Sequence, residues 1–176
     1  MKDKPTLDTT TPLPENQSPI DGSFPEQKPR KFDTLRELIL SLVPEAKRMK
    51  LYEEAFTHSS YSNEHRDSSS YERLEFLGDG VLDLVVGDLV FRAHKKYTPG
   101  KLSKLRSSIV EGRNLTEIAI KLGFAPYVKF SNGEKKNAQY HGHIFEDVFE
   151  SFIGAMYLDL GYNTNNTVEI DIAKGL

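Results

Sequence analysis

Residues 71–86 read YERLEFLGDGVLDLVV, and this stretch limits the possible folds more than any other part of the chain. Its Leu, Val and Phe residues cover nearly the whole circumference of a helix, which is typical of a helix in a protein core. The same stretch carries carboxylates three or four residues apart, at Glu72, Glu75, Asp79 and Asp83. Because residues at this spacing share a helix face, the sequence predicts a row of like charges on a helix with little free polar surface.

A second apolar segment, 143–161, repeats this arrangement with Glu146, Asp147 and Glu150. Acids on a helix commonly form its solvated face. If the two helices instead face each other, their carboxylates repel strongly unless they bind protons or a cation. A hard divalent ion such as Mg²⁺, which binds a few carboxylates together with water, would relieve that repulsion.

Two glycines, Gly78 and Gly80, flank Asp79 inside the first acidic helix. Each lowers helix propensity by about 1 kcal/mol relative to Ala. Their presence indicates that another helix, or a ligand, approaches the backbone closely. Spacing alone therefore leaves a solvated acidic face and a buried metal site as open alternatives.

Composition indicates a single soluble globular domain without membrane spans. The 176 residues are 38% hydrophobic and 28% charged, and no apolar run reaches the roughly 18 residues of a membrane span. The absence of cysteine excludes disulfides and thiolate metal sites, and no export signal is recognisable, which is compatible with a cytoplasmic location. With a net charge of −3, any nucleic-acid partner must meet a local basic patch or a further module.

The periodicity predicts an all-α domain, packed as a compact orthogonal or bundle-like set of helices. Residues 1–31 hold six of the nine prolines and are predicted to be a disordered tail. Asp33 is expected to cap the first helix, and Gly112 to break the fourth. Helices are expected over 33–43, 45–58, 71–95, 103–123 and 143–161, loops over 59–70 and 124–142, and a short helix or linker over 163–176.

The segment ERLEFLGD at 72–79 resembles the signature of the ribonuclease III family. The resemblance extends over about residues 33–162 and implies the all-α, dimer-forming endonuclease fold for a catalytic domain at 32–162. Three further blocks match the family in order and spacing: AFTHSSYSNEH (55–65), GKLSKLRSSIV (100–110) and EDVFESFIGAMYLDLGY (146–162).

Residue by residue, the resemblance assigns the family's metal-binding acids to Glu75, Asp79, Asp147 and Glu150. It implies that loss of Asp79 or Glu150 is the most damaging to catalysis. Glu72, one turn before Glu75, would help in or just outside the metal's coordination. Asp83 matches a position that is often acidic without being catalytic.

Three other positions gain a meaning from the resemblance. Phe76 corresponds to a residue that plugs into the partner subunit of the family dimer; without the resemblance it is equally well an ordinary core residue. Glu146 stands where the family commonly has a small residue and is expected to face solvent. Gly80 stands where Ser or Ala is commoner, a change that removes no ligand.

The resemblance implies a Mg²⁺-dependent endoribonuclease, with Mn²⁺ able to substitute, that acts in RNA processing, including that of ribosomal RNA. A metal-activated water would cleave double-stranded RNA to give 5′-phosphate and 3′-hydroxyl ends, and a homodimer would set two sites across one duplex. Contacts to RNA are expected from the basic stretch 92–106, above all from Lys101, Lys104 and Arg106.

The main alternative is a catalytically silent family member that serves as a binding or dimerisation module. The presence of all four acids favours the active enzyme, and a non-nuclease metal-binding protein would require an accidental match to the signature. Family members typically continue into a double-stranded-RNA-binding domain, and residues 163–176 cannot form one. The chain is then either a fragment of a longer protein or a natural short form that uses an RNA-binding module or accessory protein in trans. In both cases we expect RNA binding by this chain to be weak and salt-dependent.

Overall fold

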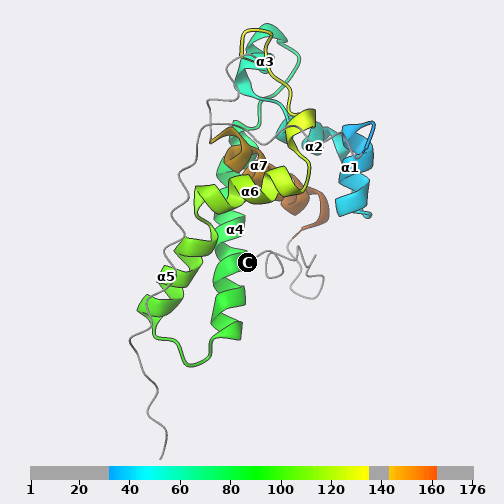
Figure 1. Ribbon diagram of the computed structural model, residues 1–176. Helices are drawn as coiled ribbons and strands as arrows, with labels where there is room; N and C mark the ends of the chain where they lie inside the picture. The colour runs from blue at the N-terminus through cyan, green and yellow to red at the C-terminus, as the bar shows by residue number, and fades with distance from the viewer. Residues whose placement is uncertain (1–31, 135–142, 162–176) are drawn as a thin grey trace, which may run out of the picture.

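The computed structural model describes residues 32–134 and 143–161, which fold into helices joined by short connections (Figure 1). The prediction of an all-α fold is confirmed; within these ranges the β structure is one isolated bridge between Thr57 and Lys129. The predicted tail at 1–31 and the segment 163–176 lie outside the described residues. The elements are α1 (Leu35–Leu42), α2 (Met49–Ala55), α3 (Ser59–Glu64), α4 (Glu72–Ala93), α5 (Pro99–Ile109), α6 (Gly112–Lys121), the short 3₁₀ helix η1 (Ala125–Tyr127) and α7 (Ile144–Leu160).

The first helix begins with a capping box, and its cap is Thr34 rather than the predicted Asp33. The Thr34 side chain accepts a hydrogen bond from the backbone N–H of Glu37, and the Glu37 carboxylate accepts one from the backbone N–H of Thr34. The prediction of Asp33 was wrong because this reciprocal pair satisfies two free N–H groups at once.

Other boundaries also differ from the prediction, and α2 is shorter than the predicted 45–58. The segment 59–70, predicted as a loop, contains α3, whose N-terminus is capped by the ring nitrogen of His58. Helix α5 begins at Pro99, four residues early, because the Thr98 side chain caps it and proline suits the first turn. The predicted break near Gly112 is confirmed, since α5 ends just before it and α6 begins there.

Helices α4 and α7 share the most extensive contact in the described part of the chain. Helices α2 and α6 pack on α7, while α5 returns alongside α4 after an open loop (Figure 1). The Phe124 ring sits in the core between these layers, with its centroid 4.9 Å from that of Phe56 and 5.1 Å from that of Phe152, both edge-on. This aromatic packing holds α7 at the centre of the domain.

The two central helices cross with their backbones in contact at Gly78 and Gly154. A Cβ atom on Gly78 would overlap the backbone carbonyl oxygen of Glu150 and lie 2.9 Å from the Gly154 nitrogen. A Cβ atom on Gly154 would overlap the carbonyl oxygen of Leu74. The crossing therefore requires glycine on both helices, and it places the acids of α4 beside those of α7.

We predict that Gly78→Ala destabilises the domain by about 3 kcal/mol or more, because the added methyl group would collide with the backbone of α7. Gly80→Ala, two residues away on the same helix, is the control, because a Cβ there meets no atom within 4 Å. We expect Gly80→Ala to stabilise the helix by about 0.5–1 kcal/mol. Urea unfolding of both variants measures the difference, and equal stabilities would contradict the close crossing.

Candidate metal centre

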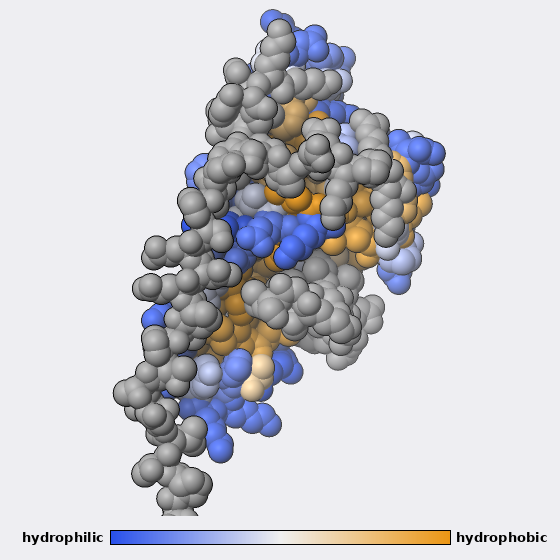
Figure 2. All heavy atoms as spheres, in the orientation of Figure 1, coloured by the Kyte–Doolittle hydropathy of each residue, from blue (hydrophilic) through white to orange (hydrophobic). Residues whose placement is uncertain are grey.

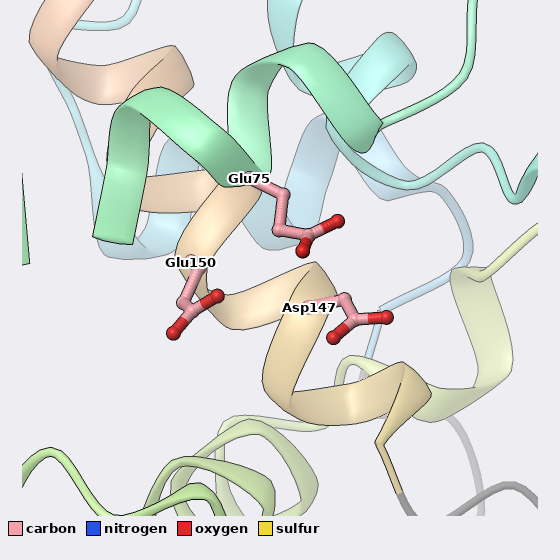
Figure 3. A group of neighbouring side chains, drawn as sticks. All are labelled: Glu75, Asp147 and Glu150. Atoms are coloured by element: carbon pink, nitrogen blue, oxygen red, sulfur yellow. The ribbon is translucent and has the colours of Figure 1, made fainter. Parts of the chain in front are cut away.

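Three partly buried carboxylates meet where α4 crosses α7. Glu75 comes from α4, and Asp147 and Glu150 come from the first two turns of α7 (Figure 3). Each offers one carboxylate oxygen such that these atoms all lie within 4.8 Å of one another. The side chains of both helices point into the same space, so the structure brings these three predicted acids together.

The other acids of the signature helix surround this group without joining it. Asp79 is exposed and lies outside the group, but its charge acts on both Glu75 and Glu150. Glu72 is exposed and accepts a hydrogen bond of 3.2 Å from the Ser70 hydroxyl. Asp83 turns away toward α5, where its Oδ1 lies 3.6 Å from the Arg106 Nε. The row of acids thus divides between the centre, its edge and the α4–α5 contact.

Burial and mutual repulsion raise the pKa of all three central carboxyl groups. Burial is the largest cause for each of them. Among the neighbouring charges, that of Asp79 raises the pKa of Glu150 the most. The pKa of Glu150 rises to about 8. The pKa of Glu75 is raised most by burial and next by the charge of Asp147. Without a cation, the centre therefore favours bound protons over full ionisation.

A tyrosine that was not predicted to belong to the site contacts the centre. The hydroxyl of Tyr71, the residue that precedes α4, donates a hydrogen bond of 2.9 Å to Asp147 Oδ2. This hydrogen bond lowers the pKa of Asp147 and so partly opposes the effect of burial. The available sequence signal was a polar aromatic residue directly before the signature.

Glu146 was expected to face solvent, but it instead packs against the start of α6. A Cβ atom on Gly112 would overlap the Glu146 carboxylate, and the His143 Nδ1 lies 3.3 Å from Glu146 Oε2. A carboxylate at a helix N-terminus is favoured by the partial positive charge there, which explains this placement. From this position its charge also raises the pKa of Glu150.

The residues predicted to contact RNA are placed differently from one another. Lys101 and Lys104 are exposed in the first turns of α5. The Lys101 Nζ lies 5.7 Å from the centre of the Tyr97 ring. Arg106 instead directs its guanidinium toward Asp83, and its Nε is buried against α4.

The donor set fits a hard divalent cation. Carboxylate oxygens are the ligands that Mg²⁺ prefers, and a cation among these groups would remove the repulsion that raises their pKa values. Acids projecting from crossing helices into one space are a recurrent way to build such a centre in helical proteins. Fold and site together define the class: an all-α domain with a candidate carboxylate metal centre.

Comparison with known proteins identifies the family. Residues 48–174 match the family model described as ribonuclease-III-like. The chain is 50% identical over 115 residues to ribonuclease 3 of Lactobacillus acidophilus, covering 64% of this chain and 50% of the relative. It is 43% identical over 135 residues to ribonuclease 3 of Streptococcus equi subsp. zooepidemicus, covering 75% of this chain and 58% of the relative. The chain therefore belongs to the ribonuclease III family.

The solved structures give the same result for the fold. The nuclease domain of ribonuclease III from Campylobacter jejuni matches with a TM-score of 0.72 and 35% identity, covering 81% of this chain and 97% of that one. Dicer from Pichia stipitis matches with a TM-score of 0.56 and 29% identity, covering 73% of this chain and 55% of that one. The chain spans about half the length of the ribonuclease 3 relatives it matches. In the described part of the chain, no helix combines the length and apolar character needed to cross a membrane.

The raised pKa of Glu150 predicts a pH-dependent stability in the absence of metal. Between its ordinary value near 4.5 and its folded value of about 8, the folded protein binds more protons than the unfolded chain. Raising the pH through this window therefore lowers the free energy of unfolding. We expect the melting temperature of the metal-free protein to fall across the window, and added Mg²⁺ to oppose the fall.

Glu150→Gln is the matching variant, because the amide keeps the shape of the side chain without its titration. Thermal melts at pH values across the window should show a shallower dependence for Glu150→Gln than for the parent chain. Identical profiles for the two proteins would contradict the raised pKa described for Glu150.

Proposed function

We propose that this chain is the catalytic part of a Mg²⁺-dependent endoribonuclease that cleaves double-stranded RNA in the cytoplasm. The products would carry 5′-phosphate and 3′-hydroxyl ends, and the reaction would serve RNA processing, including that of ribosomal RNA. The observation that carries the proposal is the convergence of Glu75, Asp147 and Glu150 where the family's signature helix crosses α7.

Each acid has a distinct part in this proposal. Glu75, Asp147 and Glu150 would hold the ion, with Mn²⁺ able to replace Mg²⁺, and Asp79 would complete the site from its exposed edge beside Glu150. When bound, Mg²⁺ supplies an activated water and neutralises charge on the phosphoryl oxygens. Because the carboxyl groups have raised pKa values, they release protons as the ion binds. Glu72, exposed one turn earlier, would support Glu75.

Substrate RNA would approach over the start of α5. Lys101 and Lys104 are exposed there, where they can contact phosphates, whereas Arg106 is partly engaged with Asp83. Duplex RNA is recognised mainly through its shape, phosphates and 2′-hydroxyls, so little base specificity is expected from this domain. With a net charge of −3, binding should be weak and strongly salt-dependent, and an RNA-binding module or accessory protein in trans would strengthen it.

A homodimer is proposed from the apolar surface of α4. The side chains of Phe76, Leu84 and Phe91 are 84%, 59% and 68% exposed. At spacings of eight and seven residues they lie along one helix face. Figure 2 shows hydrophobic residues lying open over the lower half of α4. In the nuclease domain of ribonuclease III from Campylobacter jejuni, a structurally flexible region is involved in dimer formation. Phe76 would insert into the partner subunit.

The cleavage assay compares the parent chain with Glu150→Gln and Asp79→Asn on a long RNA duplex in Mg²⁺. Each variant should lose at least about 100-fold in rate, because each loses a charged group of the metal site. Asp83→Asn is the matched control, since Asp83 belongs to the same row of acids but faces α5, and it should cleave like the parent chain.

Two results would contradict the proposal. Equal rates for the parent and both site variants would remove the acids from the mechanism. A parent chain that binds duplex RNA but never cleaves it would favour the silent binding or dimerisation module.

Sedimentation tests the dimer. We expect the parent chain to sediment as a dimer at micromolar concentration and Phe76→Ser to shift toward monomer, because the variant loses a large apolar side chain from the interface. Leu158→Ser is the control, because Leu158 is an exposed apolar residue (42%) on a different helix, α7. A monomeric parent chain, or equal weakening by both variants, would contradict this assignment of Phe76.

A further inference from the structure

Tyr71 is fixed at three points beside the carboxylate centre. Only 4% of the residue is exposed. Its backbone N–H donates a hydrogen bond of 2.9 Å to the carbonyl oxygen of Thr57, and its ring lies edge-on to His58, with 5.7 Å between centroids. Its hydroxyl donates the hydrogen bond of 2.9 Å to Asp147 Oδ2. The hydroxyl therefore cannot follow the carboxylate if Asp147 rotates.

This hydrogen bond opposes the forces that would turn Asp147 away. The charges of Glu75 and Asp147 repel each other, and burial disfavours the ionised form of both groups. A carboxylate offers two oxygens with about four acceptor positions, so the hydrogen bond from Tyr71 leaves positions free for a cation. Carboxylates that bind metals are themselves commonly held by hydrogen bonds, which orient them for the ion.

We propose that Tyr71 is a positioning residue for the metal centre. Its hydroxyl holds the Asp147 carboxylate facing Glu75 and Glu150, so that the ion binds without rearranging that side chain. The inference rests on the proposed function, since it assigns Tyr71 to the same centre. Tyr71 acts through Asp147 and has no direct part in the chemistry.

The chain contains a matched control whose hydrogen-bond acceptor lies on the same helix as Asp147, α7. Tyr52 is also buried, and its hydroxyl donates a hydrogen bond of 3.1 Å to Asp159 Oδ2 near the end of α7. The Asp159 carboxylate also accepts hydrogen bonds from the backbone N–H groups of Lys47 and Arg48, and it is not one of the three clustered acids. Tyr71→Phe and Tyr52→Phe thus remove the same kind of hydrogen bond, one at the centre and one remote from it.

The test measures Mn²⁺ binding to the whole chain without RNA, by isothermal titration and by the Mn²⁺ electron paramagnetic resonance signal. We expect Tyr71→Phe to raise the Mn²⁺ dissociation constant by about 10-fold, and the Mg²⁺ concentration for half-maximal cleavage to rise in step. Tyr52→Phe should leave both values unchanged, although both variants lower the melting temperature. Unchanged Mn²⁺ affinity in Tyr71→Phe, or an equal shift in both variants, would overturn the inference.

A second measurement uses the unaltered protein and does not depend on how Tyr71→Phe folds. With ¹³Cζ-labelled tyrosine, the Tyr71 resonance should shift on addition of Mg²⁺ while that of Tyr52 stays in place. A Tyr71 resonance that does not respond to saturating Mg²⁺ would overturn the inference about Tyr71 but not the proposed function. A parent chain that binds neither Mg²⁺ nor Mn²⁺ would overturn the proposed function, and the inference with it.

Discussion

The backbone contact between α4 and α7 is the constraint on which the rest of the structure depends. Gly78 and Gly154 let the two helices approach until a single added methyl group would collide with a carbonyl oxygen of the other helix. Glu75 precedes Gly78 by three residues, and Glu150 precedes Gly154 by four, so each carboxylate lies about one turn from the contact. The centre is therefore a consequence of the crossing, and a looser crossing would separate its acids.

Holding like charges together requires rigid support from elsewhere in the domain. Helix α7 is anchored by its buried aromatic residues and by the Ser151 hydroxyl, which donates a hydrogen bond of 2.8 Å to the carbonyl oxygen of Ala55. Near the end of α7, the Asp159 carboxylate accepts hydrogen bonds from the backbone N–H groups of Lys47 and Arg48, just before α2, and from the Tyr52 hydroxyl. The domain thus gives up stability at the acidic centre and recovers it in the core, as is common at functional sites.

The sequence predicted α4 and α7 to within two residues because long apolar periodic segments determine their own helices. It also placed acids on shared helix faces, but spacing could not distinguish a solvated face from a metal centre, and only the family resemblance selected among the acids. The hydrogen bond from Tyr71 to Asp147 joins residues 76 positions apart, and the packing of Glu146 on Gly112 is equally non-local. Such contacts follow from tertiary packing, which no local pattern encodes.

The most direct test of the centre is anomalous diffraction from crystals of the chain grown with Mn²⁺. We predict a peak at the crossing of α4 and α7, at about 2.0–2.2 Å from carboxylate oxygens of Glu75, Asp147 and Glu150. A peak ligated elsewhere at saturating Mn²⁺, or none between these three side chains, would contradict the assignment of this crossing as a metal centre.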